Sequence, residues 1–140
     1  MNTETWFLLL NALAGFSWLL LVAAPYSRIT KKLVLSVVLP GILAICYLFL
    51  AVLVATQGIE LLDTSLLGFA ELAGDPLVFV LGWAHLVCFD LVAGIWMTGD
   101  ARARGIRHRV MIVPYLLTFV AGPAGLLVYL ILRAIKSKKS

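Results

Sequence analysis

The sequence has little charge and few cysteines, and each scarcity excludes a class of protein. Of its 140 residues, 13% are charged and 63% are apolar, whereas a soluble domain carries about 25% charged and about 45–50% apolar residues. A water-soluble enzyme and a disordered tail are therefore excluded, because too few polar side chains are present to cover a surface in water. Cys46 and Cys88 lie in apolar runs, which is typical of small buried residues rather than of a disulfide or a metal pair. With a mean hydropathy of +1.07, the chain is predicted to be a membrane protein of one domain, residues 1–140.

Four apolar stretches are long enough to cross a bilayer as helices. Each is near the roughly 20 residues that a helix needs to span about 30 Å of hydrocarbon. The stretches comprise residues 6–24, 33–55, 77–97 and 110–132. Strands are excluded because the sequence lacks the alternation of polar and apolar residues that a membrane barrel requires. We therefore predict an all-α bundle of four transmembrane helices. Residues 59–72 are amphipathic and favour an additional interfacial helix, with a solvated acidic loop as the alternative.

Lysines and arginines indicate the orientation of the bundle. Residues 25–32 hold three of them, residues 98–109 hold four, the tail holds four, and residues 57–76 hold none. By the positive-inside rule, four crossings place the two basic loops in the cytoplasm and both termini outside. Because residues 1–5 carry no lysine or arginine, a cleaved signal peptide is disfavoured, and we expect an integral protein of a bacterial inner membrane.

Gly122-Pro123 interrupts the fourth stretch, and two structures are compatible with this break. A kinked helix would still span the bilayer, whereas a re-entrant hairpin turning at Gly122-Pro123 would return the tail to the basic loops. Each half of such a hairpin would have about 11 residues and a length of roughly 17 Å. Because that length is short for a membrane segment, we favour the kinked spanning helix.

Asp90 and His85, in the third stretch, are the residues best suited to chemistry. A carboxyl at the centre of a bilayer costs about 2.5–3.5 kcal/mol on insertion scales, so it normally has a partner or a task. Desolvation favours the neutral acid, which can donate a proton; a hydrogen bond to another helix is the alternative. At 100° per residue, His85 points about 140° away from Asp90. His85 is interpreted as a hydrogen-bonded interior histidine, with acid–base work and then haem or metal ligation as alternatives.

Aromatic and hydroxyl side chains on the third and fourth stretches are predicted to line a cavity for a hydrophobic small molecule. The candidates are Trp83, Phe89, Trp96, Tyr115, Thr118 and Phe119. The basic loop supplies Arg104, Arg107 and His108, which are expected to bind anionic lipid headgroups; orienting a substrate is the alternative for the last two. The sequence has no nucleotide loop or metal cluster, so no cofactor, metal or nucleic acid is expected.

Several of these residues form strings that are similar to a known family. The third stretch reads Trp-Ala-His-Leu-Val-Cys-Phe-Asp-Leu over residues 83–91, and Asp100, Arg107-His108, Pro114 and Gly122-Pro123-Ala124-Gly125 follow. Together they resemble the neoxanthin synthase family, the small membrane proteins linked to abscisic-acid deficiency. Ile95 stands where that family usually has an arginine.

The resemblance implies a four-helix membrane protein of carotenoid metabolism. In plants the family is associated with converting the epoxide of violaxanthin into the allene of neoxanthin, an isomerisation that needs no redox cofactor. It implies that Asp90 acts as the acid and His85 as the base. The hypothesis is therefore a carotenoid or isoprenoid isomerase; a non-catalytic carotenoid-binding, lipid-binding or accessory protein is the alternative, and a purely structural protein is the third.

Overall fold

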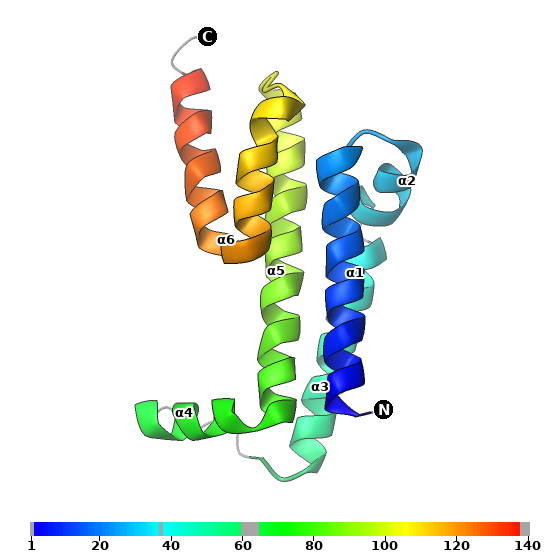
Figure 1. Cartoon of the computed structure of the whole chain (residues 1–140), viewed down its shortest axis with the longest axis vertical. Helices are drawn as coiled ribbons and strands as arrows, with labels where there is room; N and C mark the ends of the chain where they lie inside the picture. The colour runs from blue at the N-terminus through cyan, green and yellow to red at the C-terminus, as the bar shows by residue number, and fades with distance from the viewer. Residues whose placement is uncertain (1, 37, 60–64, 138–140) are drawn as a thin grey trace.

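The protein is a bundle of helices in which α5 occupies the centre (Figure 1). The computed structural model describes residues 2–36, 38–59 and 65–137, and these contain helices and no strands. The elements are α1 (Thr3–Ala23), α2 (Arg28–Thr30), the π-helix η1 (Lys31–Leu35), α3 (Val38–Thr56), α4 (Leu66–Gly74), α5 (Pro76–Ala103) and α6 (His108–Ser137). Helix α5 contacts α1, α3, α4 and α6. The predicted all-α fold is confirmed.

Four helical stretches are long and apolar enough to cross a membrane, as the sequence predicts. They are Thr3–Ala23, Arg28–Thr56, Pro76–Ala103 and His108–Lys136. Large apolar side chains remain exposed on their outer faces, among them Leu48, Val52 and Phe89. A soluble monomer does not tolerate apolar surface on this scale, so these faces fit a hydrocarbon environment. The chain is a membrane protein.

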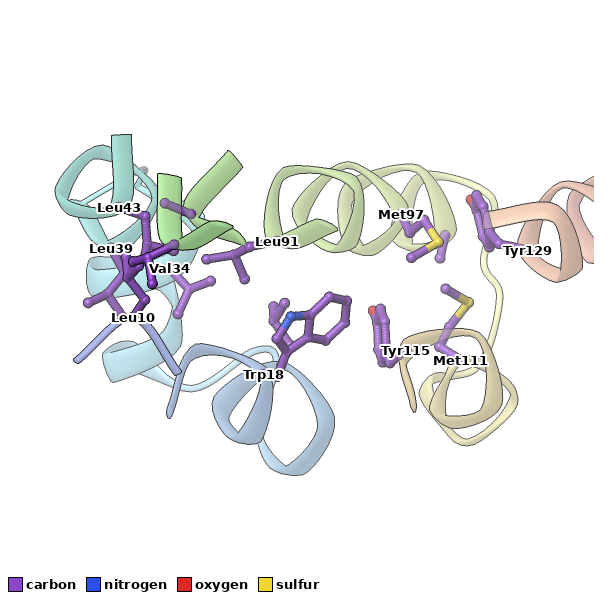
Figure 2. Close-up of a cluster of buried hydrophobic side chains, with 14 of the residues drawn as sticks. Leu10, Trp18, Val34, Leu39, Leu43, Leu91, Met97, Met111, Tyr115 and Tyr129 are labelled. Atoms are coloured by element: carbon purple, nitrogen blue, oxygen red, sulfur yellow. The ribbon is translucent and has the colours of Figure 1, made fainter. Parts of the chain in front are cut away.

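The core lies where α5 meets α1, α3 and α6. Figure 2 shows Trp18 of α1 reaching across to Tyr115 of α6, with ring centroids 6.3 Å apart. Gly94 of α5 permits this approach, because a Cβ there would lie 2.7 Å from the Trp18 ring. Both aromatic side chains are buried. The contact joins three helices at one point.

Helix α5 has well-defined ends. Asp75 caps its first turn by accepting hydrogen bonds from the amides of Leu77 and Val78 at 2.7 and 3.1 Å, and Pro76 occupies the first turn, where no amide is needed. At the other end Gly105 has a positive φ of 63° and closes a Schellman motif, which only glycine adopts without strain. The helix continues six residues beyond the predicted end at Met97, because polar residues extend it past the apolar stretch.

Helix α6 breaks at Ala121, whose φ and ψ are −147° and 58°. Pro123 disfavours a helical Gly122 before it and offers no amide to the preceding turn, so the predicted break is confirmed. The break is more than a kink, however: Figure 1 shows the second half of α6 running back beside the first. Gly125 lets the two halves pack backbone to backbone, since a Cβ there would lie 2.5 Å from the carbonyl oxygen of Pro114.

The reversal brings the C-terminal half of α6 back to the end of α5. Tyr129 Oη donates a hydrogen bond to Asp100 Oδ2, and Arg133 Nε lies 3.2 Å from the same oxygen. The guanidinium of Arg133 also stacks over the ring of Trp96, 5.5 Å from its centroid. A straight α6 would carry Arg133 more than about 35 Å from His108. The expected position of both termini at one end of the bundle is therefore wrong: the C-terminal end lies at the opposite end from the N-terminus (Figure 1).

This arrangement collects the basic residues at one end of the bundle. The connection from α1 to α3, the connection from α5 to α6 and the C-terminal end of α6 all lie there (Figure 1). These segments and the helix ends next to them carry every lysine and arginine among the described residues: Arg28, Lys31, Lys32, Arg102, Arg104, Arg107, Arg109, Arg133 and Lys136. Under the positive-inside rule, the C-terminal end of α6 joins the two basic loops on the same side.

Helix α4 lies crosswise to α5 at the opposite end of the bundle (Figure 1). Of the predicted interfacial helix over residues 59–72, residues 60–64 lie outside the described part, and the helix that is described begins at Leu66 and ends at Gly74. Leu66, Leu67 and Phe69 are exposed. A helix with exposed leucine and phenylalanine at the end of a membrane bundle fits the interface.

Candidate functional site

Asp90 is half-buried at the centre of α5 and faces the turn of the α6 hairpin. A Cβ at Gly122 would overlap with Asp90 Oδ1 and would lie 2.9 Å from Cγ, so the carboxyl lies directly against the turn. Asp90 makes no hydrogen bond or ion pair with any residue that the structure describes. A carboxyl at this depth is costly without a partner, which makes it the first candidate for contact with a ligand.

A cavity of about 660 Å³ opens beside Asp90. Helices α1 and α5 and the hairpin turn supply its walls, which comprise Asn11, Ala14, Trp18, Trp83, Leu86, Val87, Asp90, Phe119, Val120, Ala121, Gly122, Pro123 and Ala124. Its wall is mainly apolar and aromatic. Asn11 Oδ1 accepts a hydrogen bond from Trp83 Nε1 at 3.3 Å, and the Asn11 amide donates to the carbonyl of Phe7 at 2.8 Å. We refer to this space as the Asp90 cavity.

The hairpin turn adds backbone polarity to the Asp90 cavity. A helix leaves its last carbonyls and first amides without partners inside the helix, and the break at Ala121 places one end of each half of α6 at the turn. In a membrane, such irregular backbone is tolerated only inside protein or against a cavity. The turn thus gives the cavity polar groups besides the carboxyl.

His85 lines a different cavity from Asp90, as the spacing along the helix predicts. This second space, the His85 cavity, has a volume of about 480 Å³ and lies between α3, α4 and α5. The His85 ring packs against Phe89 and Tyr47, with centroids 4.7 and 5.7 Å away. Trp83 and Leu86 contribute to both walls. The residues that the resemblance pairs as acid and base therefore do not meet across one space.

The sequence was also compared with known protein families. The model of the family described as ABA DEFICIENT 4-like matches residues 5–129, which include α5 and the hairpin turn. The chain belongs to the ABA DEFICIENT 4-like family. Its membership, which the sequence predicts, connects it with carotenoid-related membrane proteins. No curated protein and no solved structure has significant similarity to the chain.

In this ABA DEFICIENT 4-like protein, two of the six predicted ligand-binding residues lie beside Asp90. Trp83 and Phe119 line the Asp90 cavity, and the Phe119 ring packs 6.0 Å from that of Trp18. Phe89 contacts the His85 ring instead. The aromatic wall around Asp90 is therefore formed by residues from α1, α5 and α6.

The other three lie outside both cavities and make structural contacts. Trp96 packs edge-on against Tyr129, with centroids 5.5 Å apart. Tyr115 is buried and shares a hydrogen bond of 2.8 Å with Thr98. Thr118 is also buried and donates to the carbonyl of Pro114 at 2.8 Å, where it supports the hairpin. In this family member, these side chains stabilise the packing of α6.

The predicted headgroup-binding residues are also separated. Arg107 is exposed, whereas Arg104 Nε donates to Asp100 Oδ2 at 2.8 Å. His108 is turned inward: its Nε2–H donates to the carbonyl of Val22 at 2.8 Å, and among the described residues its Nδ1 has no partner. Arg107 is thus the member of this set whose side chain makes no hydrogen bond or ion pair with any described residue.

Sequence reasoning did not identify Asn11, Trp18 or Asp100 as site residues. Asn11 is one of two polar interruptions in the first apolar stretch. A polar residue in such a stretch is uncommon, and this could have identified Asn11 as a candidate site residue. Asp100 is held by three donors at the end of α5, so it anchors α6 rather than binding a ligand. Trp18 carried no signal, because a tryptophan in an apolar stretch is ordinary. Among the described residues no group of three or more metal-ligating side chains occurs.

Proposed function

We propose that this protein binds a carotenoid or a related isoprenoid in the Asp90 cavity and acts there as an isomerase. One observation carries the proposal: the carboxyl at the middle of the central helix has no partner among the described residues and faces an aromatic, mainly apolar cavity. An apolar cavity with a few convergent polar groups is the usual form of a small-molecule site. Family membership supports a carotenoid-related ligand.

The size and walls of the cavity fit part of such a molecule. About 660 Å³ accommodates one ring of a carotenoid and the beginning of its polyene, while the remainder of the chain would lie along the lipid-facing surface. Trp18, Trp83 and Phe119 offer flat apolar faces to the ring. The ligand's oxygen would then be placed beside the Asp90 carboxyl, where a hydrogen bond replaces the one that the protein lacks.

Asp90 alone can balance the protons of an epoxide-to-allene isomerisation. Its neutral carboxylic acid donates a proton to the epoxide oxygen as the carbon–oxygen bond breaks, which produces a hydroxyl group. The carboxylate that results accepts a proton from the adjacent carbon, and the electron pair of that carbon–hydrogen bond forms the new double bond. The net change is an isomerisation, and Asp90 returns to its acid form. His85 has no part in this proposal because it lines the other cavity.

The test is pigment analysis of the full chain produced in a host that makes epoxidised carotenoids. The wild-type protein should bind pigment after detergent purification and should increase the allenic product in extracts. Asp90→Asn keeps the shape of the side chain and removes the acid, so product formation should fall by about 10²-fold or more, the range for general acid–base catalysis. Pigment binding should persist.

A cavity-filling variant separates binding from chemistry. Ala124→Phe adds a ring to an exposed wall position of the cavity and should reduce bound pigment, whereas Ala12→Phe, on an exposed position of α1 outside the cavities, should not. Equal pigment in the two variants contradicts binding in this cavity. If pigment binds but Asp90→Asn forms as much product as wild type, or no product forms at all, the isomerase is rejected and the non-catalytic carotenoid binder remains.

A further inference from the structure

Two polar side chains in the His85 cavity have no hydrogen-bond partner in the part of the chain that the structure describes. His85 and Tyr47 both line it, their ring centroids lie 5.7 Å apart, and neither ring makes a hydrogen bond to any residue that the structure describes. Phe89 covers the other side of the imidazole through an apolar contact. Two adjacent side chains with unused donors and acceptors thus face the same space.

Both side chains lie well away from the nearer ends of their helices. Tyr47 is nine residues from either end of α3 (Val38–Thr56), and His85 is nine residues from the start of α5, or about 13 Å at 1.5 Å per residue. At this depth a polar group that is left unpaired costs free energy. The position therefore favours a partner that reaches the cavity from within the bilayer.

The rest of the wall is apolar and open to the outer surface of the bundle. Phe69 and Leu72 of α4 cover one end, and Phe79 and Leu86 of α5 supply the side. Leu86 and Phe79 are more than half exposed, so a molecule dissolved in the membrane can enter without crossing a protein barrier. The volume of about 480 Å³ is within the range of small-molecule pockets.

We propose that the His85 cavity binds a membrane-soluble alcohol through His85 and Tyr47. A neutral imidazole has one acceptor nitrogen, and a tyrosine hydroxyl can donate. A ligand hydroxyl complements both at once: its O–H donates to the imidazole while its oxygen accepts from Tyr47. An ether or epoxide oxygen can only accept, and a hydrocarbon does neither. This second site is independent of the isomerase proposal, which uses Asp90.

Histidine NMR provides a direct test, because the chain has two histidines. The full chain, labelled with ¹⁵N-histidine in detergent micelles, is titrated with farnesol, with farnesyl methyl ether and with the hydrocarbon farnesene. Farnesol should shift the ring nitrogens of His85 saturably. His108, whose Nε2–H is bonded to the Val22 carbonyl outside the cavity, serves as the internal control. The ether, which loses one hydrogen bond, should bind about tenfold more weakly than farnesol, and the hydrocarbon, which loses both, more weakly still.

Four variants test whether the alcohol binds in the His85 cavity. Tyr47→Phe removes one hydroxyl without changing the packing and should weaken farnesol about tenfold while leaving farnesene unchanged; Tyr26→Phe, outside the cavity, is the matched control. Gly82→Leu fills the cavity at a position with no atom within 4 Å and should abolish binding of every probe. Asp90→Asn should leave farnesol binding unchanged.

The outcomes separate specific binding from partition into the micelle. Equal affinity for farnesol and farnesene, an unshifted His85, or identical behaviour of Tyr47→Phe and Tyr26→Phe each overturns the proposed alcohol site. If farnesol does not bind at His85 but the Asp90-dependent pigment product still forms, the alcohol site is rejected and the isomerase proposal is unaffected. The reverse result, farnesol binding without pigment chemistry, rejects only the isomerase.

Discussion

Gly125 provides the sharpest test of the α6 hairpin. In Gly125→Ala the new Cβ would lie 2.5 Å from the carbonyl oxygen of Pro114 and would overlap with the backbone nitrogen and hydroxyl of Thr118. Ordinary contact begins at 3.4 Å, so the carbonyl oxygen of Pro114 alone requires the two halves of α6 to separate by about 0.9 Å, and the closer overlap with Thr118 requires more. Backbone atoms cannot move aside as a flexible side chain does. Overpacking of this kind costs about 1–3 kcal/mol.

Gly99→Ala is the matched control, and we expect it to stabilise the protein rather than destabilise it. Gly99 lies in α5 (Pro76–Ala103), and a Cβ there meets no atom within 4 Å. Alanine in an open helical position stabilises by about 0.5–1 kcal/mol relative to glycine. The free energies of unfolding of Gly125→Ala and Gly99→Ala should therefore differ by about 1.5–4 kcal/mol, with Gly125→Ala the less stable.

The measurement is unfolding of the two variants and wild type by SDS in mixed micelles, followed through tryptophan fluorescence. Because the hairpin turn also lines the Asp90 cavity, Gly125→Ala should in addition reduce bound pigment, whereas Gly99→Ala should not. If Gly125→Ala is as stable as Gly99→Ala, the two halves of α6 do not pack as the structure shows, and a continuous α6 becomes the better description.

Two further results follow from the reversal of α6. After replacement of the native cysteines, Lys136→Cys and Arg107→Cys should react with a membrane-impermeant thiol reagent from the same side, and Thr3→Cys from the other; reaction of Lys136→Cys together with Thr3→Cys contradicts the hairpin. Asp100→Asn should destabilise the protein by about 1–3 kcal/mol in the same SDS assay, because it weakens the anchor of the buried Tyr129 hydroxyl; a stability equal to wild type would show that this anchor contributes nothing.

The apolar helices could be predicted from the sequence because hydropathy is a local property. The stretch of residues 77–97 identified α5, and the isolated carboxyl within it identified Asp90. The angle between Asp90 and His85 also followed from helical geometry alone, and the structure places them in separate cavities. The cavities themselves could not be predicted, since Asn11 and Phe119 come from other helices and are brought to Asp90 only by packing.

The direction of α6 was not accessible in the same way. Pro123 and Gly122 predict a break, but a break permits a kink and a reversal equally. A reversal is distinguished from a kink by packing contacts: the close approach of Gly125 to Pro114, and the contacts of Tyr129 and Arg133 with the end of α5. The sequence disfavoured a hairpin because each half of α6 is too short to cross a membrane by itself. That argument does not apply when the two halves pack against each other and against α5.

The reversal of α6 removes a conflict with the positive-inside rule that arises if all four helices cross the membrane. Under four crossings, the four basic residues of the tail lie across the membrane from the seven of the two loops, against the usual charge bias. In the folded-back α6, the described lysines and arginines lie at one end, and Asp100 binds Arg104 and Arg133 there. The same reversal places the turn at the middle of α5, directly against Asp90. The contacts of Asp100 with Tyr129 and Arg133 thus hold the C-terminal half of α6 beside the end of α5, and the turn that precedes this half forms a wall of the cavity proposed for the chemistry.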